Sequence, residues 1–209
     1  LENARLYQST LSTAERLAIL NEVSSEISAS LDPDNIYKAV HHAARRLMPT
    51  ESFVIALLNE ERGVIDGVYL VDNDECSPQM DLPIGKGISG RVIKTGMPLI
   101  LNGSQNTAAM DGVTGGELGM PQSIVAVPMR SGEKVIGMLS AQSYQPDVYT
   151  EDDQQILSTL ANQSITAIQN ARLFAETQRL AEELEQRVID RTAALQAEKR
   201  NTETLLDIL

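Results

Sequence analysis

The sequence predicts an α+β fold, in which an antiparallel sheet is built from hairpins and has helices before and after it. Residues 52–58 with 64–71, and residues 124–129 with 134–144, are strand-like pairs joined by short polar turns, as in antiparallel hairpins. Helical periodicity precedes the first pair and follows the second. The 209 residues are 42 % apolar but only 3 % aromatic, and there is no Trp, so we expect an aliphatic core.

Residues 1–31 are predicted to form one helix. Apolar residues recur there every three or four positions, at Ala4, Tyr7, Leu11, Ala14 and Ala18, and then on a nearby stripe at Leu20, Val23 and Ile27. Before about residue 17 this stripe is narrow and rich in Ala. It therefore favours contact with another helix over packing on the chain's own domain.

A second helix is expected from Asp32, which can cap it, and Pro33, which suits its first position. Its buried face is predicted to be Ile36, Val40, Ala43, Ala44 and Leu47. His41 and His42 are neighbours on this helix and point about 100° apart, so they cannot share a metal. We interpret both as solvated.

Residues 72–80 are polar and turn-rich, which predicts a loop that exposes Cys76. A single cysteine excludes an internal disulfide and a cysteine-based zinc site, and it agrees with a reducing compartment. No His or Lys lies nearby in the sequence, so a reactive role for this thiol is not favoured.

Residues 85–90, GKGISG, match the GxGxxG pattern of dinucleotide-binding folds. Pro83 interrupts any preceding strand, the following helix is short and the neighbouring elements are hairpins, so this function is disfavoured. We expect a tight turn that starts a short helix ending at Gly96. One alternative stays open, in which free N–H groups at the helix start meet an anionic ligand. The Gly-rich residues 102–122 are predicted to be a lid, a binding loop or a disordered segment.

The C-terminal part is predicted to be one long helix, because residues 150–209 contain neither Pro nor Gly. Its apolar face is wide as far as Ile168, which is typical of packing on a domain core. After about Arg179 the face narrows to Leu180, Leu184, Val188 and Leu195 in a charged background. That narrow stripe is typical of a coiled-coil seam, here with a four-residue stutter.

A short sequence motif near the start of the chain is repeated near residue 170. Residues 3–7, NARLY, match residues 170–174, NARLF. The match suggests a tandem array in which residues 1–8 are the tail of a preceding module of the same kind. We accordingly expect the chain to be part of a longer protein.

Charge and motif content narrow the function classes. The net charge of −12 and the absence of a dense basic stripe disfavour nucleic acid as a partner. The longest uncharged helical run is interrupted by Gln, Asn, Ser and Thr, so direct membrane insertion is not expected. No nucleophile elbow, Walker loop, Cys–His pair or metal-ligand cluster is recognisable. We therefore expect a cytoplasmic non-enzyme with no identifiable cofactor.

Taken together, three segments resemble the GAF domain, a small sensory module of phosphodiesterases, cyclases, phytochromes and bacterial sensor kinases. They are residues 82–101 (LPIGKGISGRVIKTGMPLIL), residues 123–143 (SIVAVPMRSGEKVIGMLSAQS), and residues 149–153 (YTEDD) leading into the long helix. The resemblance implies an antiparallel sheet of five or six strands with helices on both faces, and a small-molecule pocket under loops that include residues 102–122.

The resemblance also implies an organisation and a function. A linker helix would span residues 1–16, a GAF domain residues 17–174, and a coiled-coil signalling helix residues 175–209. The last resembles the signalling linkers of bacterial receptors of the sensor histidine kinase type. The module would bind a small molecule, or relay a conformational signal, through a dimeric helix to an output domain such as a kinase, a cyclase or another sensor. The alternative is a ligand-free dimerisation spacer in a tandem GAF array, and a catalytic GAF variant is a third possibility.

The expected site residues follow from strand alternation over residues 134–144. Ile136, Met138, Ser140, Gln142 and Tyr144 would share one side, which we expect to face the pocket. The predicted ligand-binding residues are Ile88, Met110, Met138, Ser140 and Gln142. The predicted homodimer interface comprises Leu11, Leu20, Ile27, Leu180, Leu184, Val188 and Leu195.

Known ligands of the family do not carry over. Cyclic-nucleotide-binding members have Asn-Lys where this chain has Gln142 and Ser143. Bilin-binding members of the phytochrome type use a Cys-His pair, and no cysteine here precedes a histidine. Haem would need an axial His, yet both histidines lie before the sheet.

Overall fold

The computed structural model describes residues 16, 18–27, 29–82, 84–103 and 120–206, with side chains as far as residue 196. Residues 18–27 are helical. The further helices are α2 (Pro33–Leu47), α3 (Gly87–Thr95) and α5 (Glu151–Leu206). The strands are β1 (Ser52–Asn59), β2 (Val64–Asp72), β3 (Glu75–Ser77), β4 (Met80–Leu82), β5 (Leu99–Asn102), β6 (Ser123–Ser131) and β7 (Lys134–Ser143).

The strands form one antiparallel sheet in the order β3-β2-β1-β7-β6-β5, with β4 also paired to β2. Both predicted hairpins, β1–β2 and β6–β7, are confirmed. The sheet has seven strands rather than five or six, because β3 forms within the residues 72–80 that were predicted to be a loop, and β4 begins at the end of that loop. Cys76 is therefore on a short edge strand, where it is exposed.

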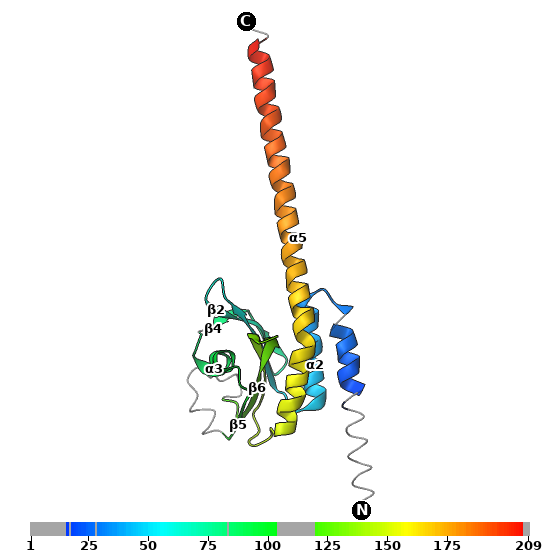
Figure 1. Cartoon of the computed structure of the whole chain (residues 1–209), viewed down its shortest axis with the longest axis vertical. Helices are drawn as coiled ribbons and strands as arrows, with labels where there is room; N and C mark the ends of the chain where they lie inside the picture. The colour runs from blue at the N-terminus through cyan, green and yellow to red at the C-terminus, as the bar shows by residue number, and fades with distance from the viewer. Residues whose placement is uncertain (1–15, 17, 28, 83, 104–119, 207–209) are drawn as a thin grey trace, which may run out of the picture.

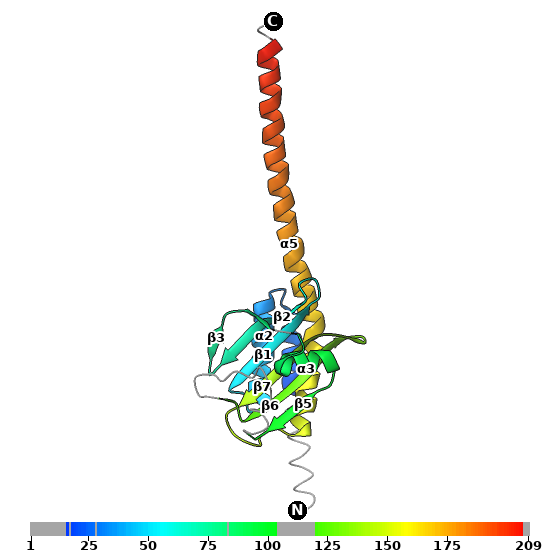
Figure 2. The same ribbon diagram turned by 90° about the vertical axis from the view of Figure 1, so that its left-hand side faces the viewer.

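Helices cover both faces of the sheet, as predicted (Figure 1). The larger core lies between the sheet and α2, α5 and residues 18–27, and it includes Ile27, Phe53, Leu139 and Leu160. The smaller core lies under α3 on the opposite face, which is turned toward the viewer in Figure 2. Both cores are largely aliphatic, in keeping with the composition.

The helix starts follow the capping rules read from the sequence. Asp32 Oδ1 accepts a hydrogen bond from the Asp34 N–H at 3.0 Å, and Pro33 is the first residue of α2. At the start of α5, Asp153 Oδ2 accepts the Thr150 N–H at 2.8 Å, while the Asp153 N–H approaches Thr150 Oγ1 at 3.4 Å. This reciprocal pair is a capping box with Asp in place of Glu.

Strand β7 does not alternate regularly, which corrects one expectation. Its register against β6 shifts between Met129 and Arg130, so Ile136 has no direct partner. Beyond this bulge the side chains change face. Ile136 packs with the α5-side core, as Leu139 does, while Val135 packs under α3 with Met138. Ile136 therefore does not share a side with Met138.

Helix α5 continues far past the sheet as a single rod (Figure 1). Its buried residues end at Ala171, and the later side chains with described exposure are exposed through residue 196. No helix in the described ranges is long and apolar enough to cross a membrane.

Candidate functional site

The α3 side of the sheet is where the sequence predicts a ligand pocket, and its geometry starts with the glycine motif. Gly85 and Gly87 have φ angles of 82° and 63°, in the left-handed region that favours glycine. A Cβ on Gly90 would lie 2.7 Å from the Gly85 nitrogen. The motif therefore forms a tight turn with close backbone approach, as expected. The alternative role of this helix start toward an anion stays open.

Helix α3 ends as the sequence predicts. Gly96 adopts the left-handed conformation, with φ of 63°, and its N–H donates to the Val92 carbonyl at 2.8 Å. Its carbonyl accepts a hydrogen bond from Arg130 Nη2 at 2.8 Å. The C-terminal end of α3 is thereby attached to the β6–β7 hairpin.

Four of the five predicted pocket residues are described and lie on this face, but they differ in surroundings. Ile88 and Met138 are buried in the smaller core. Gln142 is half-buried near the end of β7. Ser140 is fully buried on β7, opposite Val54 of β1 and Ala126 of β6. Met110 lies outside the described residues.

Ser140 stands out because its hydroxyl has no visible partner. Within the described part of the chain, Ser140 Oγ is buried and makes no hydrogen bond. A buried hydroxyl without a partner costs about 1–3 kcal/mol relative to one that is paired. By contrast, Ser143 Oγ, also buried on β7, accepts the Gln145 N–H at 3.1 Å.

Polar groups gather where β1, β2 and β7 end beside this face. Tyr144 donates its hydroxyl hydrogen to Asp72 Oδ1 at 2.7 Å. Burial, and then the bond to Asp72, raise the pKa of Tyr144, so it stays a neutral donor. Glu51 Oε2 is also buried and lacks a hydrogen bond among the described groups. These carboxylates disfavour an anionic ligand at this end of the sheet.

Two clefts lie where α5 leaves the domain. One, of about 570 Å³, separates the ends of the β1–β2 and β6–β7 hairpins from α5. Its hairpin wall includes Glu60, Glu61 and Lys134, and its helix wall includes Arg172, Ala175, Glu176 and Arg179. The other, of about 520 Å³, lies between α2, β2, β4 and Arg172. Sequence reasoning missed both, because each combines residues from distant segments.

His41 corrects the interpretation of both histidines as solvated. Its ring stacks on Phe53 at 5.0 Å between centroids, and Nδ1 lies 3.1 Å from the Tyr69 hydroxyl. It is buried, whereas His42 is exposed. Burial, together with the nearby Arg45 cation, lowers the pKa of His41 to about 4. His41 is therefore a neutral core residue at neutral pH.

The predicted dimer residues fall into two groups. Ile27 is fully buried in the chain's own core, where it cannot contact a partner, so that assignment is wrong. Leu20 is half-buried against the same core, and Leu11 lies outside the described residues. Exposed apolar side chains follow along α5: Leu180, Leu184, Val188 and Leu195, which were predicted, and Leu173, Phe174 and Ile189, which were not.

No group of three or more His, Cys, Asp or Glu side chains able to hold a metal occurs in the described residues. The sequence itself matches the GAF domain family over residues 30–169. The chain belongs to the GAF domain family. GAF domains are regulatory and sensory modules of signalling proteins, and the match lies within the predicted domain of residues 17–174. The outer boundaries stay a prediction.

A curated relative gives the regulatory context. The chain is 27 % identical over 169 residues to the Nif-specific regulatory protein of Azospirillum brasilense, which covers 78 % of this chain. The aligned region spans only 27 % of that relative. The relative is therefore much longer than the matched GAF region.

Solved GAF structures share the fold at low sequence identity. The GAF domain of a phosphoenolpyruvate-protein phosphotransferase from Coxiella burnetii is 18 % identical, with a TM-score of 0.62 over 77 % of this chain and 96 % of that one. The free methionine-R-sulfoxide reductase of Neisseria meningitidis, solved with its substrate, is 18 % identical, with a TM-score of 0.56 over 77 % and 92 %. The GAF domain of a two-component sensor histidine kinase from Bacillus halodurans is 15 % identical, with a TM-score of 0.57 over 70 % and 99 %.

These likenesses establish the fold, not a shared ligand or reaction. Enzymes and regulators occur together among the structural neighbours. Among the curated relatives, the Nif-specific regulatory protein is regulatory by name. A regulatory role is thus what the GAF family and the name of the curated relative have in common.

Proposed function

We propose that this chain is a cytoplasmic sensory GAF module that binds a neutral small molecule on the α3 side of its sheet. The observation that carries the proposal is the buried Ser140 hydroxyl, which lacks a partner among the described groups. A ligand that hydrogen-bonds to Ser140 Oγ would remove the cost of that unpaired group. Ile88, Met110, Met138 and Gln142 complete the proposed site, and the carboxylates nearby favour a ligand without phosphate.

The signal would leave the domain along α5, in a homodimer. A regularly spaced apolar row on α5 is strongly exposed: the exposed fractions are 45 % for Leu180, 60 % for Leu184, 63 % for Val188 and 57 % for Leu195. Such a row is typical of a helix that packs against a partner. On an ideal helix this row lies about 180° from the buried row that ends at Ala171. A second copy could therefore pack along α5 while both domains stay outside the seam. The output would be a kinase, a cyclase, a further sensor or, as the name of the curated relative suggests, the remaining domains of a regulatory protein.

Small-molecule mass spectrometry of protein purified from its native host tests the ligand. We expect a compound near one equivalent per chain with the natural sequence, and clearly less of it with Ser140→Ala, which removes the hydroxyl that the ligand would bond. Ser143→Ala is the matched control, because that buried serine already has a partner. A clean spectrum, with no thermal shift in a metabolite screen, would reject the ligand site.

The second candidate is a ligand-free dimerisation spacer in a tandem array. The close packing of Ile88 and Met138 under α3 favours it, because these side chains already fill part of the face. The two candidates predict different results in the metabolite screen, but both predict a homodimer. Sedimentation that gives a monomer at high micromolar concentration would reject both.

A further inference from the structure

The free end of the β6–β7 hairpin is held only weakly by the sheet. Strand β5 pairs with β6 only as far as Ala126, and β1 pairs with β7 only as far as Gly137. Beyond these points the two strands pair with each other alone. Figure 2 shows this end projecting from the sheet past α3. A two-stranded ribbon of this kind is marginally stable without further contacts.

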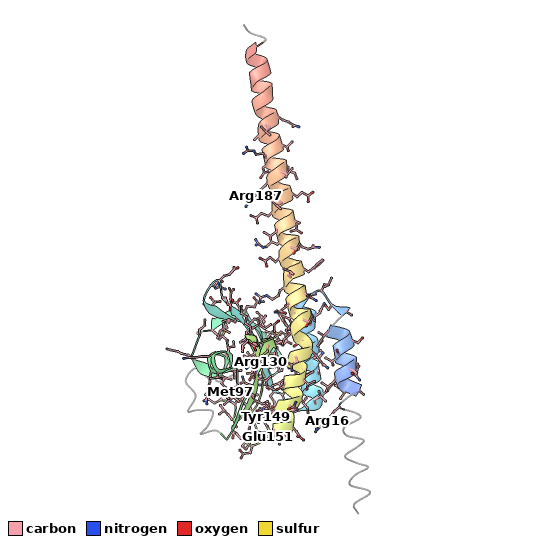
Figure 3. The ribbon with its side chains drawn as sticks, in the orientation of Figure 1. Arg16, Met97, Arg130, Tyr149, Glu151 and Arg187 are labelled. Atoms are coloured by element: carbon pink, nitrogen blue, oxygen red, sulfur yellow. The ribbon has the colours of Figure 1, made fainter. Side chains whose placement is uncertain are left out.

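One such contact attaches the hairpin end to α3. Arg130, labelled in Figure 3, donates from Nη2 to the Gly96 carbonyl at 2.8 Å, and its Nη1 lies 3.4 Å from the Glu133 carbonyl across the turn. A cation at a helix C-terminus is stabilised by the helix dipole. A Cβ on residue 96 would lie 2.5 Å from Nη2, so a side chain there would displace the guanidinium from this position. We refer to the Arg130–Gly96 contact as the latch.

The other side of the same hairpin end faces α5 across the cleft of about 570 Å³. The bulge directs Ile136 toward this side and Val135 toward α3, so neighbouring residues contact the two cores. At the base of the free end, a Cβ on Gly137 would lie 2.5 Å from the Ala56 carbonyl oxygen. The base is therefore tightly packed against β1, while the end has open space on its α5 side.

The two walls of the cleft carry complementary charges. Glu60 and Glu61 lie on the hairpin wall, with Arg172 and Arg179 on the helix wall, and Lys134 is matched by Glu176. Lys134 Nζ currently pairs with Glu60 Oε2 at 2.7 Å, within its own wall. Among the described residues, no ion pair joins the two walls. Closure of the cleft would bring these opposite charges together.

We propose that the hairpin end is a strap between α3 and α5, held open by the latch and able to close on α5 when the latch is released. This inference rests on the proposed sensory function, since it supplies a connection between the ligand side and the output helix. A ligand that displaces α3 would break the latch, and closure would then restrain the first exposed turns of α5. The cleft lies on the domain side of α5, so the proposed dimer seam does not block it.

Hydrogen exchange measured by mass spectrometry at residues 172–179 tests the strap without a ligand. Arg130→Ala breaks the latch, and we expect amides in that segment to exchange about fivefold more slowly. The matched control is Lys94→Ala, which removes a cation from the last turn of α3 but leaves the latch intact. Adding Glu60→Gln, Glu61→Gln and Lys134→Gln to Arg130→Ala should restore the original rate, because the hairpin wall then loses its charges.

A second variant tests the same contact in case Arg130→Ala does not fold. Gly96→Asn breaks the latch from the other side, and Asn tolerates the left-handed conformation. Unchanged or faster exchange in both latch variants, or an equal effect of Lys94→Ala, would overturn the strap. Sedimentation and ligand retention, measured on the same samples, report the proposed function separately. If these persist while exchange does not respond, only the strap is wrong.

Discussion

Replacing Ser140 with alanine should stabilise the ligand-free protein, although the side chain is fully buried. The hydroxyl has no partner among the described groups, so its removal recovers a cost of about 1–3 kcal/mol. The space left by one oxygen atom costs only about 0.3 kcal/mol. The net gain expected in the free energy of unfolding is therefore about 0.7–2.7 kcal/mol.

Urea unfolding measures this directly. With a slope of roughly 2 kcal/mol per M, the midpoint should rise by about 0.3–1.4 M while the slope stays constant. Ser143→Ala should do the opposite and cost about 1 kcal/mol, because it removes the acceptor of the Gln145 N–H. If Ser140→Ala lowers the midpoint as much as Ser143→Ala does, the hydroxyl has a partner within the chain. The argument for a ligand at that position would then fail.

Three further predictions concern other parts of the fold. Leu184→Asp, in the middle of the exposed row, should raise the Kd of the dimer more than about 100-fold, because it buries an unpaired charge in the seam. Ile189→Asp is the control and should have little effect on the Kd, because that residue lies off the row. Sedimentation measures both. The folded pKa of His41 is below its unfolded value, so neutral His41 stabilises the fold above pH 6.5, and this contribution is lost as the pH falls toward 4. His41→Phe should therefore flatten the stability profile between those values, as measured by urea midpoints. Thr150→Ala should cost about 1 kcal/mol in the free energy of unfolding by removing half of the α5 capping box, and an unchanged thermal midpoint would contradict this.

Local patterns were sufficient for most of the fold. Turn residues and alternation located both hairpins, and Asp32 marked the start of α2, because capping and turns depend on residues close in sequence. The bulge near Ile136 was not predictable in this way. It depends on how β7 meets β1 and β6, which strand alternation alone does not encode.

The candidate site was predicted less completely, for the same physical reason. Ser140 and Met138 were placed on a common side of the sheet. Only the tertiary structure reveals that Met138 is packed in the smaller core and that the Ser140 hydroxyl lacks a hydrogen bond. His41 is buried by Phe53 and Tyr69, which come from strands later in the chain. Ile27 matched a helix–helix stripe, yet the partner of that stripe is the chain's own core.

The uninterrupted course of α5 makes it a mechanical lever. Its buried part ends at Ala171, and the free part up to Leu206 is roughly 50 Å long at about 1.5 Å per residue. A tilt of about 5° at the point where α5 leaves the domain would move the far end sideways by roughly 4 Å, about half of the 8–10 Å that separates packed helix axes. Displacements in the domain too small to disturb its packing could thus change the spacing between α5 and a partner helix at the far end.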